Sequence, residues 1–179
     1  MRWNVISLFD VVVLSASCTS TKNTTSQEDD YTCYVNPFIG SDFTGNSYPG
    51  AQVPIGMVQL RPDNGLPGWA RIAGYFYPDS TIAGFSHTHL SGTGAGDLYD
   101  ISFMPVTLPY NETEAPLGIH SKFSHQNEQA TAGYYQVMLT DYNINVELTA
   151  TERCGIQRYT FPKANAAIFL NLSKAMNWV

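Results

Sequence analysis

Two of the four histidines of this chain lie two residues apart, directly before a glycine-rich run. Residues 85–96 read Phe-Ser-His-Thr-His-Leu-Ser-Gly-Thr-Gly-Ala-Gly, so small residues follow His87 and His89. In an extended strand, residues i and i+2 point to the same face. We therefore predict that both imidazoles project together, toward a ligand or a partner domain. Their spacing also suits a metal pair, with Asp97 or Asp100 as a third ligand.

A second candidate contact with a ligand is Trp69, which lies in a loop rich in proline and glycine. A flat indole ring suits the C–H face of a pyranose, and the alternative is that the ring anchors its loop in the core. Asn46 and Ser91 are further candidates for binding the same ligand. The run 91–96 lacks the lysine and the following helix of a phosphate loop. Its glycines instead let the backbone approach a ligand closely.

The composition excludes one large class of partner and favours another. Charged residues make up 13% of the 179 residues, well below the usual quarter or so. The net charge is −6 and no cluster of lysine and arginine is present, which excludes nucleic acid as a partner. Aromatic residues also reach 13%, a content typical of surfaces that bind sugars or peptides. The length allows one domain with a sizeable core.

The N-terminus reads as a targeting segment followed by a linker. Residues 1–17 have a positive start, an apolar run and small residues before Cys18, as in a bacterial lipoprotein signal. The apolar run is too short for a membrane-spanning helix. We expect Cys18 to be acylated, residues 18–30 to be a flexible polar tether, and residues 31–179 to form the domain. This arrangement predicts a lipid-anchored protein of the periplasm or cell surface, with no other contact to a membrane.

Two further cysteines, Cys33 and Cys154, have two possible states. They could form a disulfide in an oxidising compartment, provided that their Cα atoms lie within about 7 Å. The prediction favoured by the sequence is two buried free thiols. Their spacing does not suggest a zinc site.

The elements that must position these residues are expected to be short strands. In the second half of the chain, apolar residues alternate at i and i+2, which places each set on one strand face. The sets are Tyr135, Val137 and Leu139; Ile144, Val146, Leu148 and Ala150; and Ala166, Ile168, Leu170 and Leu172. Earlier, 56–60 reads as a buried strand and 61–71, with its prolines and glycines, as a loop. Many short strands without an amphipathic helix predict an all-β, antiparallel β-sandwich.

Several ordered motifs are more specific than the strand pattern. They are Val-Asn-Pro-Phe-Ile-Gly at 35–40, Tyr-Pro-Gly-Ala at 48–51, Gly-Met-Val-Gln-Leu at 56–60, the histidine segment 84–94, and Glu-Leu-Thr-Ala-Thr-Glu-Arg at 147–153, with support from 123–125, 133–135 and 158–162. In these motifs the chain resembles the N-terminal domain of glycoside hydrolase family 92, the calcium-dependent exo-acting α-mannosidases. The resemblance runs from about residue 34 to the end.

The resemblance implies a β-sandwich of the galactose-mutarotase-like supersandwich type. In family members a larger (α/α)6-barrel domain follows, and a mannose pocket lies between the two domains. Family members are inverting enzymes, which need a general acid and a general base about 6.5–9.5 Å apart. In the family both carboxylates and most calcium ligands belong to the helical domain. The chain is therefore expected to be the carbohydrate-binding part of an exo-α-mannosidase, truncated before its catalytic domain and inactive alone. Its implied partners are mannose-containing glycans and that domain.

Two segments depart from the family pattern. Residues 68–70 read Gly-Trp-Ala where members often have Gly-Trp-Asp, and 75–77 read Tyr-Phe-Tyr where Tyr-His-Tyr is common. An acidic and an imidazole position are thus apolar here, which leaves specificity at the sugar rim undecided. Two other functions stay open. One is a surface carbohydrate-binding module without catalysis, and the other is a cupin-like metal enzyme built on His87 and His89.

Overall fold

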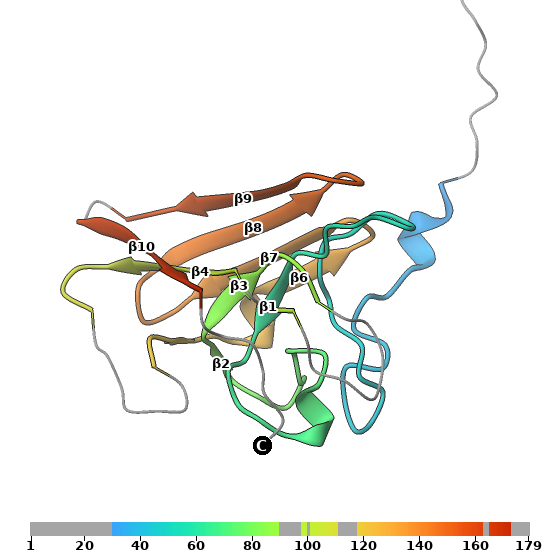
Figure 1. Ribbon diagram of the computed structural model, residues 1–179, viewed down its shortest axis with the longest axis horizontal. Coiled ribbons are helices and arrows are strands. Elements are labelled where there is room, and N and C mark those ends of the chain that lie inside the picture. The colour runs from blue at the N-terminus through green and yellow to red at the C-terminus, as the bar shows by residue number, and fades with distance from the viewer. Residues whose placement is uncertain (1–29, 90–97, 100, 111–117, 163–164, 173–179) are drawn as a thin grey trace, which may run out of the picture.

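The computed structural model describes residues 30–89, 98–99, 101–110, 118–162 and 165–172, and these form antiparallel sheets (Figure 1). The strands are β1 (Arg61–Asp63), β2 (Thr81–Ile82), β3 (Gly84–Ser86), β4 (Ser102–Thr107), β5 (Ser121–Lys122), β6 (Glu128–Thr131), β7 (Tyr134–Leu139), β8 (Ile144–Ala150), β9 (Gly155–Thr160) and β10 (Ala166–Asn171). The short 3-10 helices are η1 (Tyr31–Tyr34), η2 (Trp69–Arg71) and η3 (His125–Asn127). None of the helices in the described ranges is long and apolar enough to span a bilayer.

Two four-stranded sheets carry the core. One has the order β1-β3-β4-β10 and the other β6-β7-β8-β9, while β2 and β5 form a separate pair. The chain passes from one sheet to the other between β9 and β10, because β9 pairs with β8 whereas β10 pairs with β4. The predicted all-β class with antiparallel sheets is therefore confirmed.

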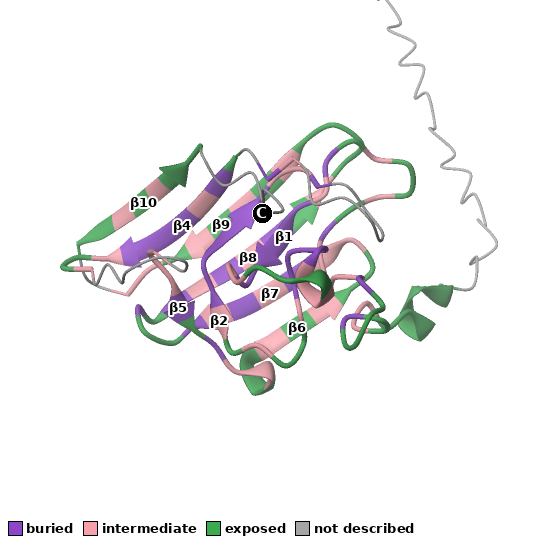
Figure 2. Ribbon diagram, turned by 60° about the horizontal axis from the view of Figure 1, so that its bottom comes forward, coloured by how far each residue is buried: buried purple, intermediate pink, exposed green. Residues whose placement is uncertain are grey.

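The alternation predicted for β7 and β8 is confirmed. Figure 2 shows buried and less buried residues alternating along both strands. Val137 of β7 and Val146 of β8 are opposite each other in the ladder and completely buried. They belong to one apolar cluster with Met104 and Val106 of β4, which come from the other sheet. Burial of apolar side chains from both sheets is what holds the sheets together.

The segment around β1 differs from the prediction. Residues 56–60 do not form a strand; Leu60 makes only an isolated bridge with Ala51. The strand lies instead at Arg61–Asp63, inside the segment expected to be a loop. Pro62 lies in this strand because β1 is at the edge of its sheet, where a residue without a backbone N–H is tolerated.

The last strand shows its predicted set of residues on one face, but that face is turned outward. Ile168 and Leu170 of β10 are 50% and 52% exposed. The residues between them, Ala167 and Phe169, pack against the core. Because nearly every residue of β10 is apolar, alternation could not indicate which of the two sets is buried.

The cysteine prediction is half right. Cys33 and Cys154 are both free, as expected, but both are exposed rather than buried. Cys33 belongs to η1, and Cys154 lies in the turn before β9. Both positions are therefore outside the apolar cluster that the two sheets enclose.

Because one face of β10 is packed on the core and the other is exposed, shortening a side chain on each face should lower the free energy of unfolding by different amounts. Phe169→Ala is expected to lower the free energy of unfolding by about 2–3 kcal/mol, because it leaves a void beside the core. Leu170→Ala is expected to cost less than about 1 kcal/mol, because its side chain is half exposed. Urea denaturation of both variants measures the two values. Equal costs, or a larger cost for Leu170→Ala, would contradict this register.

Candidate functional site

The ring of His89 lies in a buried polar cluster at the end of β3. Its Nε2 is 2.9 Å from Oδ1 of Asp63 and also contacts the hydroxyl of Ser86. All three side chains are buried. Burial is the main cause that lowers the pKa of His89 to about 4, against the opposing effect of Asp63. The imidazole is therefore neutral at pH 7, and its Nε2–H donates to the Asp63 carboxylate.

His87 has different surroundings. Its ring centroid is 6.0 Å from that of Phe103. Phe103 and Ser86 belong to opposite faces of the sheet, because Ser86 pairs with Ser102, the residue next to Phe103. The prediction that the two histidines project together is therefore wrong. The physical reason is that β3 ends at Ser86, so the alternation of a strand does not continue to His89.

The cluster around His89 does not have the geometry of a catalytic triad. Ser86 and Asp63 both contact the same nitrogen, Nε2, whereas a triad needs the carboxylate on one ring nitrogen and the hydroxyl on the other. The second nitrogen, Nδ1, is buried and has no hydrogen-bond partner in the described ranges. The arrangement fixes the orientation of the segment that follows β3 and does not activate a nucleophile.

A buried arginine lies beside this cluster. Arg61 is completely buried, donates to the carbonyl of Ala73 over 2.8 Å and to Oε1 of Gln59 over 2.6 Å, and stacks its guanidinium 3.3 Å above the Tyr48 ring. Burial lowers the pKa of Arg61 to about 10, so it stays charged at pH 7. Its charge is close enough to Asp63 for the two to offset part of each other's desolvation cost.

Trp69 begins η2 and its side chain is 55% exposed. The helix that carries it is held from its other end. Arg71 binds both oxygens of Asp79 at 2.6 Å and lies 4.8 Å from the centre of the Phe76 ring. The sequence left open whether Trp69 contacts a sugar or anchors its loop in the core, and the second alternative does not fit this exposure.

Of the remaining predicted site residues, only Asn46 lies in the described part of the chain, and it is buried. Asn46 is 6% exposed, has a left-handed backbone with φ 50°, and donates to the carbonyl of Thr44 over 3.2 Å. It therefore shapes a turn instead of facing solvent. Ser91, Cys18, Asp97 and Asp100 lie outside the described residues.

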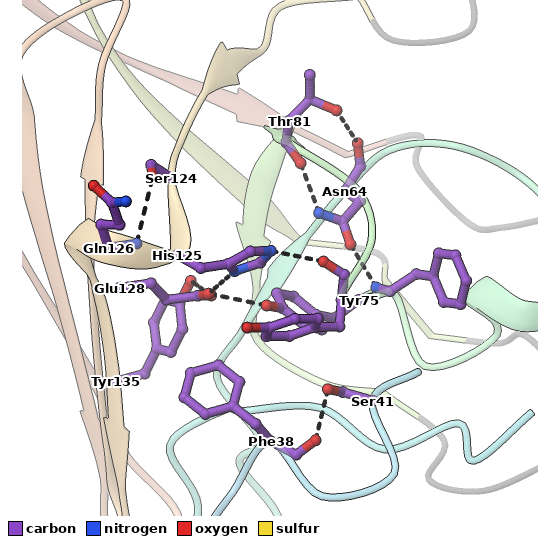
Figure 3. A network of polar contacts seen from close by, with 12 residues as sticks. Phe38, Ser41, Asn64, Tyr75, Thr81, Ser124, His125, Gln126, Glu128 and Tyr135 are labelled. Carbon is purple, nitrogen blue, oxygen red and sulfur yellow. Dashed lines mark hydrogen bonds and ion pairs between the residues drawn. The ribbon is translucent and has the colours of Figure 1, made fainter. Parts of the chain in front are cut away.

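Sequence reasoning missed a second polar network, centred on Glu128 (Figure 3). Its carboxylate accepts hydrogen bonds from the hydroxyl of Tyr75 at 3.0 Å, the hydroxyl of Tyr135 at 2.7 Å and Nδ1 of His125 at 2.6 Å. The Glu128 side chain is only 1% exposed. The pKa values of both tyrosines are raised, mainly by burial and next by the nearby charge of Glu128. Both hydroxyls therefore keep their protons.

His125 joins this network to the first half of the chain. Its Nε2 donates to the carbonyl of Tyr77 over 2.7 Å, and its ring stacks on the Tyr77 ring at 4.0 Å. The backbone N–H of Tyr77 in turn donates to the carbonyl of Ser41 over 2.8 Å. The motif 123–125 drew attention to this histidine, but nothing in the sequence signalled a partner 48 residues away.

A hollow of about 540 Å³ opens beside the Glu128 network. Its walls come from the loop 36–43 on one side, and from Tyr77, His125 and Glu128 on the other. Figure 3 shows Phe38 and Ser41 of this loop beside Tyr75, and the backbone of Ser41 is hydrogen-bonded to that of Tyr77. The hollow has a volume typical of small-ligand sites.

Comparison with known proteins identifies the family. Residues 34–179 match the profile described as "Glycosyl hydrolase family 92 N-terminal domain". A family 92 α-mannosidase from Bacteroides thetaiotaomicron, whose structure was solved with mannoimidazole, is 43% identical to this chain and superposes with a TM-score of 0.74. The match covers 79% of this chain and 19% of that protein's chain. A family 92 inverting mannosidase from Bacteroides thetaiotaomicron VPI-5482 is 31% identical with a TM-score of 0.62 over 76% of this chain and 19% of its own.

A curated relative adds a more distant match. The "uncharacterized secreted glycosidase" of Arthroderma benhamiae is 28% identical over 149 residues, which are 78% of this chain and 18% of that protein. The chain thus spans about a fifth of the length of these relatives. The chain belongs to glycosyl hydrolase family 92, of which residues 34–179 are the N-terminal domain, as its motifs predicted.

The lowered pKa of His89 predicts a loss of stability in acid. The unfolded chain takes up a proton near the ordinary value of 6.5, whereas the folded chain resists protonation down to about 4. Stability should therefore fall as the pH drops through this window, by about 2 kcal/mol between pH 7 and pH 4.5 from this residue. Urea titrations of the parent chain and of His89→Gln at both pH values test this. A loss of the same size in His89→Gln would contradict the assignment to His89.

The Glu128 network predicts a large cost for removing its charge. In Glu128→Gln an amide with its own N–H groups faces three donors, and the free energy of unfolding should fall by about 2–4 kcal/mol. Glu147→Gln is the matched control, because Glu147 pairs with the exposed Arg158 on the outer side of the sheet. That change should cost less than about 1 kcal/mol. Similar costs for the two variants in chemical denaturation would contradict the structural role of Glu128.

Proposed function

We propose that this chain is the N-terminal, carbohydrate-binding part of an inverting exo-α-mannosidase that hydrolyses terminal α-mannosides of glycans. The observation that supports this most is the 43% identity to an α-mannosidase whose structure was solved with mannoimidazole. A second mannosidase among the relatives is described as inverting. Membership of the same family makes mannose-containing glycans the substrates proposed for the intact protein.

Trp69 is the residue that we propose to contact the sugar. It combines an exposed indole ring with a backbone fixed by the Arg71–Asp79 ion pair, so little conformational entropy is lost when a pyranose stacks on it. His87 lies one residue beyond the end of β3 and is half-buried, and we propose it as a second, polar contact with the ligand. His89 fixes the same segment from within the protein through its bond to Asp63.

We propose that the chain alone does not hydrolyse mannosides. Inverting hydrolysis needs one carboxylic acid and one carboxylate that face the glycosidic bond from opposite sides. Four carboxylates of the described ranges are engaged elsewhere: Asp63 with His89, Asp79 with Arg71, Glu128 with two tyrosines and a histidine, and Glu147 with Arg158. The family resemblance implies that the acid and the base belong to the helical domain, and we propose the same for this protein.

A calcium ion is implied for the intact enzyme by the family resemblance. Ca²⁺ takes about six to eight oxygen ligands, several of them carboxylates. The described residues contain no group of three or more His, Cys, Asp or Glu side chains that could hold a metal. These residues do not fit a calcium ion, so no step proposed for them involves one. Calcium stays a prediction for the intact enzyme, with its ligands mostly outside this chain.

We propose that the protein acts outside the cytosol. The support is the relative described as a secreted glycosidase, together with the signal-like residues 1–17. Acylation of Cys18 is the finer prediction, and metabolic labelling with an alkyne fatty acid would test it through loss of the label in Cys18→Ser.

Two assays on the purified chain test the proposal. The first is release of p-nitrophenol from p-nitrophenyl α-mannoside, which should not exceed the uncatalysed rate. Turnover that survives substitution of Trp69, His87 and His89 would contradict the division of roles. The second is titration of the ¹⁵N-labelled chain with methyl α-mannoside, followed by NMR through the backbone amide of Arg71 next to the proposed contact. Trp69→Ala should weaken binding at least tenfold, whereas Tyr34→Ala, which removes a more exposed ring from η1, should not. Equal effects would exclude Trp69 as the contact.

A further inference from the structure

We propose that the hollow between loop 36–43 and the Glu128 network is a second saccharide-binding site, separate from the one assigned to Trp69. This inference rests on the proposed function for the choice of α-mannosides as ligands. The site itself rests on the shape and chemistry of its walls. It would take a neutral pyranose unit of a glycan.

The wall formed by the loop is rigid before any ligand binds. The backbone N–H of Ser47 donates to the carbonyl of Gly40 over 3.1 Å, and the N–H of Ser41 donates to that of Phe38 over 3.2 Å. Gly45 lies so close to Gly40 that an added Cβ would come within 2.2 Å of the Gly40 oxygen. Such a crossing fixes the loop, and a preformed site avoids the entropic cost of ordering it on binding.

The hollow presents aromatic rings for the apolar face of a sugar. The Phe43 side chain is 82% exposed, on a left-handed backbone with φ 53°. Tyr77 stacks one face of its ring on His125, and its ring makes an edge-to-face pair with Phe38, with centroids 6.0 Å apart. Strained non-glycine backbone and outward aromatic rings concentrate at binding sites, because each costs stability that folding alone does not require.

The polar groups of the hollow suit hydroxyls better than ions. Asp42 is exposed, and its Oδ1 accepts from the Phe43 N–H at 2.6 Å, which leaves the other carboxylate oxygen to accept from a sugar hydroxyl. Glu128 already has three donors, so its charge is compensated within the protein. The lining residues include no lysine or arginine, which argues against a phosphate or a carboxylate ligand.

One turn links this hollow to the helix of Trp69. Tyr77 forms part of the wall, while Asp79, two residues later, holds Arg71 of η2. The hollow and the helix of Trp69 are thus linked through residues 77–79. Two weak sites that are linked in one chain raise the overall affinity for a ligand that reaches both.

The test is a titration of the ¹⁵N-labelled chain with methyl α-mannoside and with α-mannobiose, followed by NMR. The backbone amides of Asp42, Phe43 and Tyr77 report on the hollow, and the indole N–H of Trp69 reports on the other site. With methyl α-mannoside, which fills one site at a time, we expect saturable shifts of the hollow amides that persist in Trp69→Ala with less than a twofold change in Kd. Phe43→Ala and Asp42→Asn should each raise that Kd at least tenfold.

Matched variants control for the loss of a ring and of a charge. Tyr34→Ala removes a similarly exposed ring, and Glu152→Gln neutralises an exposed carboxylate elsewhere; neither should change the Kd by more than twofold. Shifts confined to the Trp69 indole would overturn the second site and leave the proposed function intact. Shifts of the hollow amides by choline or Ca²⁺ but not by the mannosides would overturn it in favour of a cation site. No response of these amides to any of the ligands would overturn it as well.

Discussion

The carboxylate of Glu128 ties the loops of the first half of the described chain to the sheet β6-β7-β8-β9. It lies at the start of β6 and is bonded to Tyr75, which is 53 residues earlier, and to Tyr135 of the neighbouring strand. His125 adds a third bond, and its other nitrogen faces a backbone carbonyl. The ring of His125 thus bridges the Glu128 carboxylate and the backbone of Tyr77. A buried carboxylate with three donors offsets its desolvation, whereas one with fewer would not.

The loops that we assign to sugar binding depend on this junction. Tyr77, which receives the bond from His125, also donates its N–H to Ser41, so the first loop is tied to the sheet through one residue. The turn after Tyr77 holds η2 through the Arg71–Asp79 ion pair. The buried amide of Asn64 reinforces the same segment, because it bonds both Phe76 and Thr81 at 2.6 Å. Long loops without regular structure can thus present fixed side chains, which a binding site requires.

The sequence predicted those parts of the fold that depend on local pattern. The strands β7 and β8 follow from strict alternation of apolar residues, and the family follows from ordered motifs. The strands β6 and β9 were missed, because glutamine, arginine and glycine break their apolar pattern and pairing with neighbours makes them strands. The segment of β1 was predicted to be a loop because it contains Pro62. Proline is tolerated in an edge strand, but which strand lies at the edge depends on the whole sheet and cannot be read from this segment.

The candidate site was less predictable than the fold, because its contacts join segments that are distant in the sequence. The spacing of His87 and His89 indicated a pair only on the assumption that the strand continues past Ser86, which it does not. Trp69 is exposed, and its contact with a sugar stays a prediction. Glu128 carried no local signal at all, because its partners lie in three separate segments. Contacts between distant segments are set by the packing of the sheets, which no window of sequence contains.

The measurement that tests most directly whether this junction holds the binding loops is amide hydrogen exchange in the parent chain and in Glu128→Gln. Local unfolding should raise exchange in segments 36–47 and 69–79 while the amides of β7 and β8 stay protected. Glu147→Gln should leave all four regions unchanged. If the two loops exchange at the parent rate in Glu128→Gln, or if β7 and β8 lose protection together with them, the loops are not held through Glu128 and the account is wrong.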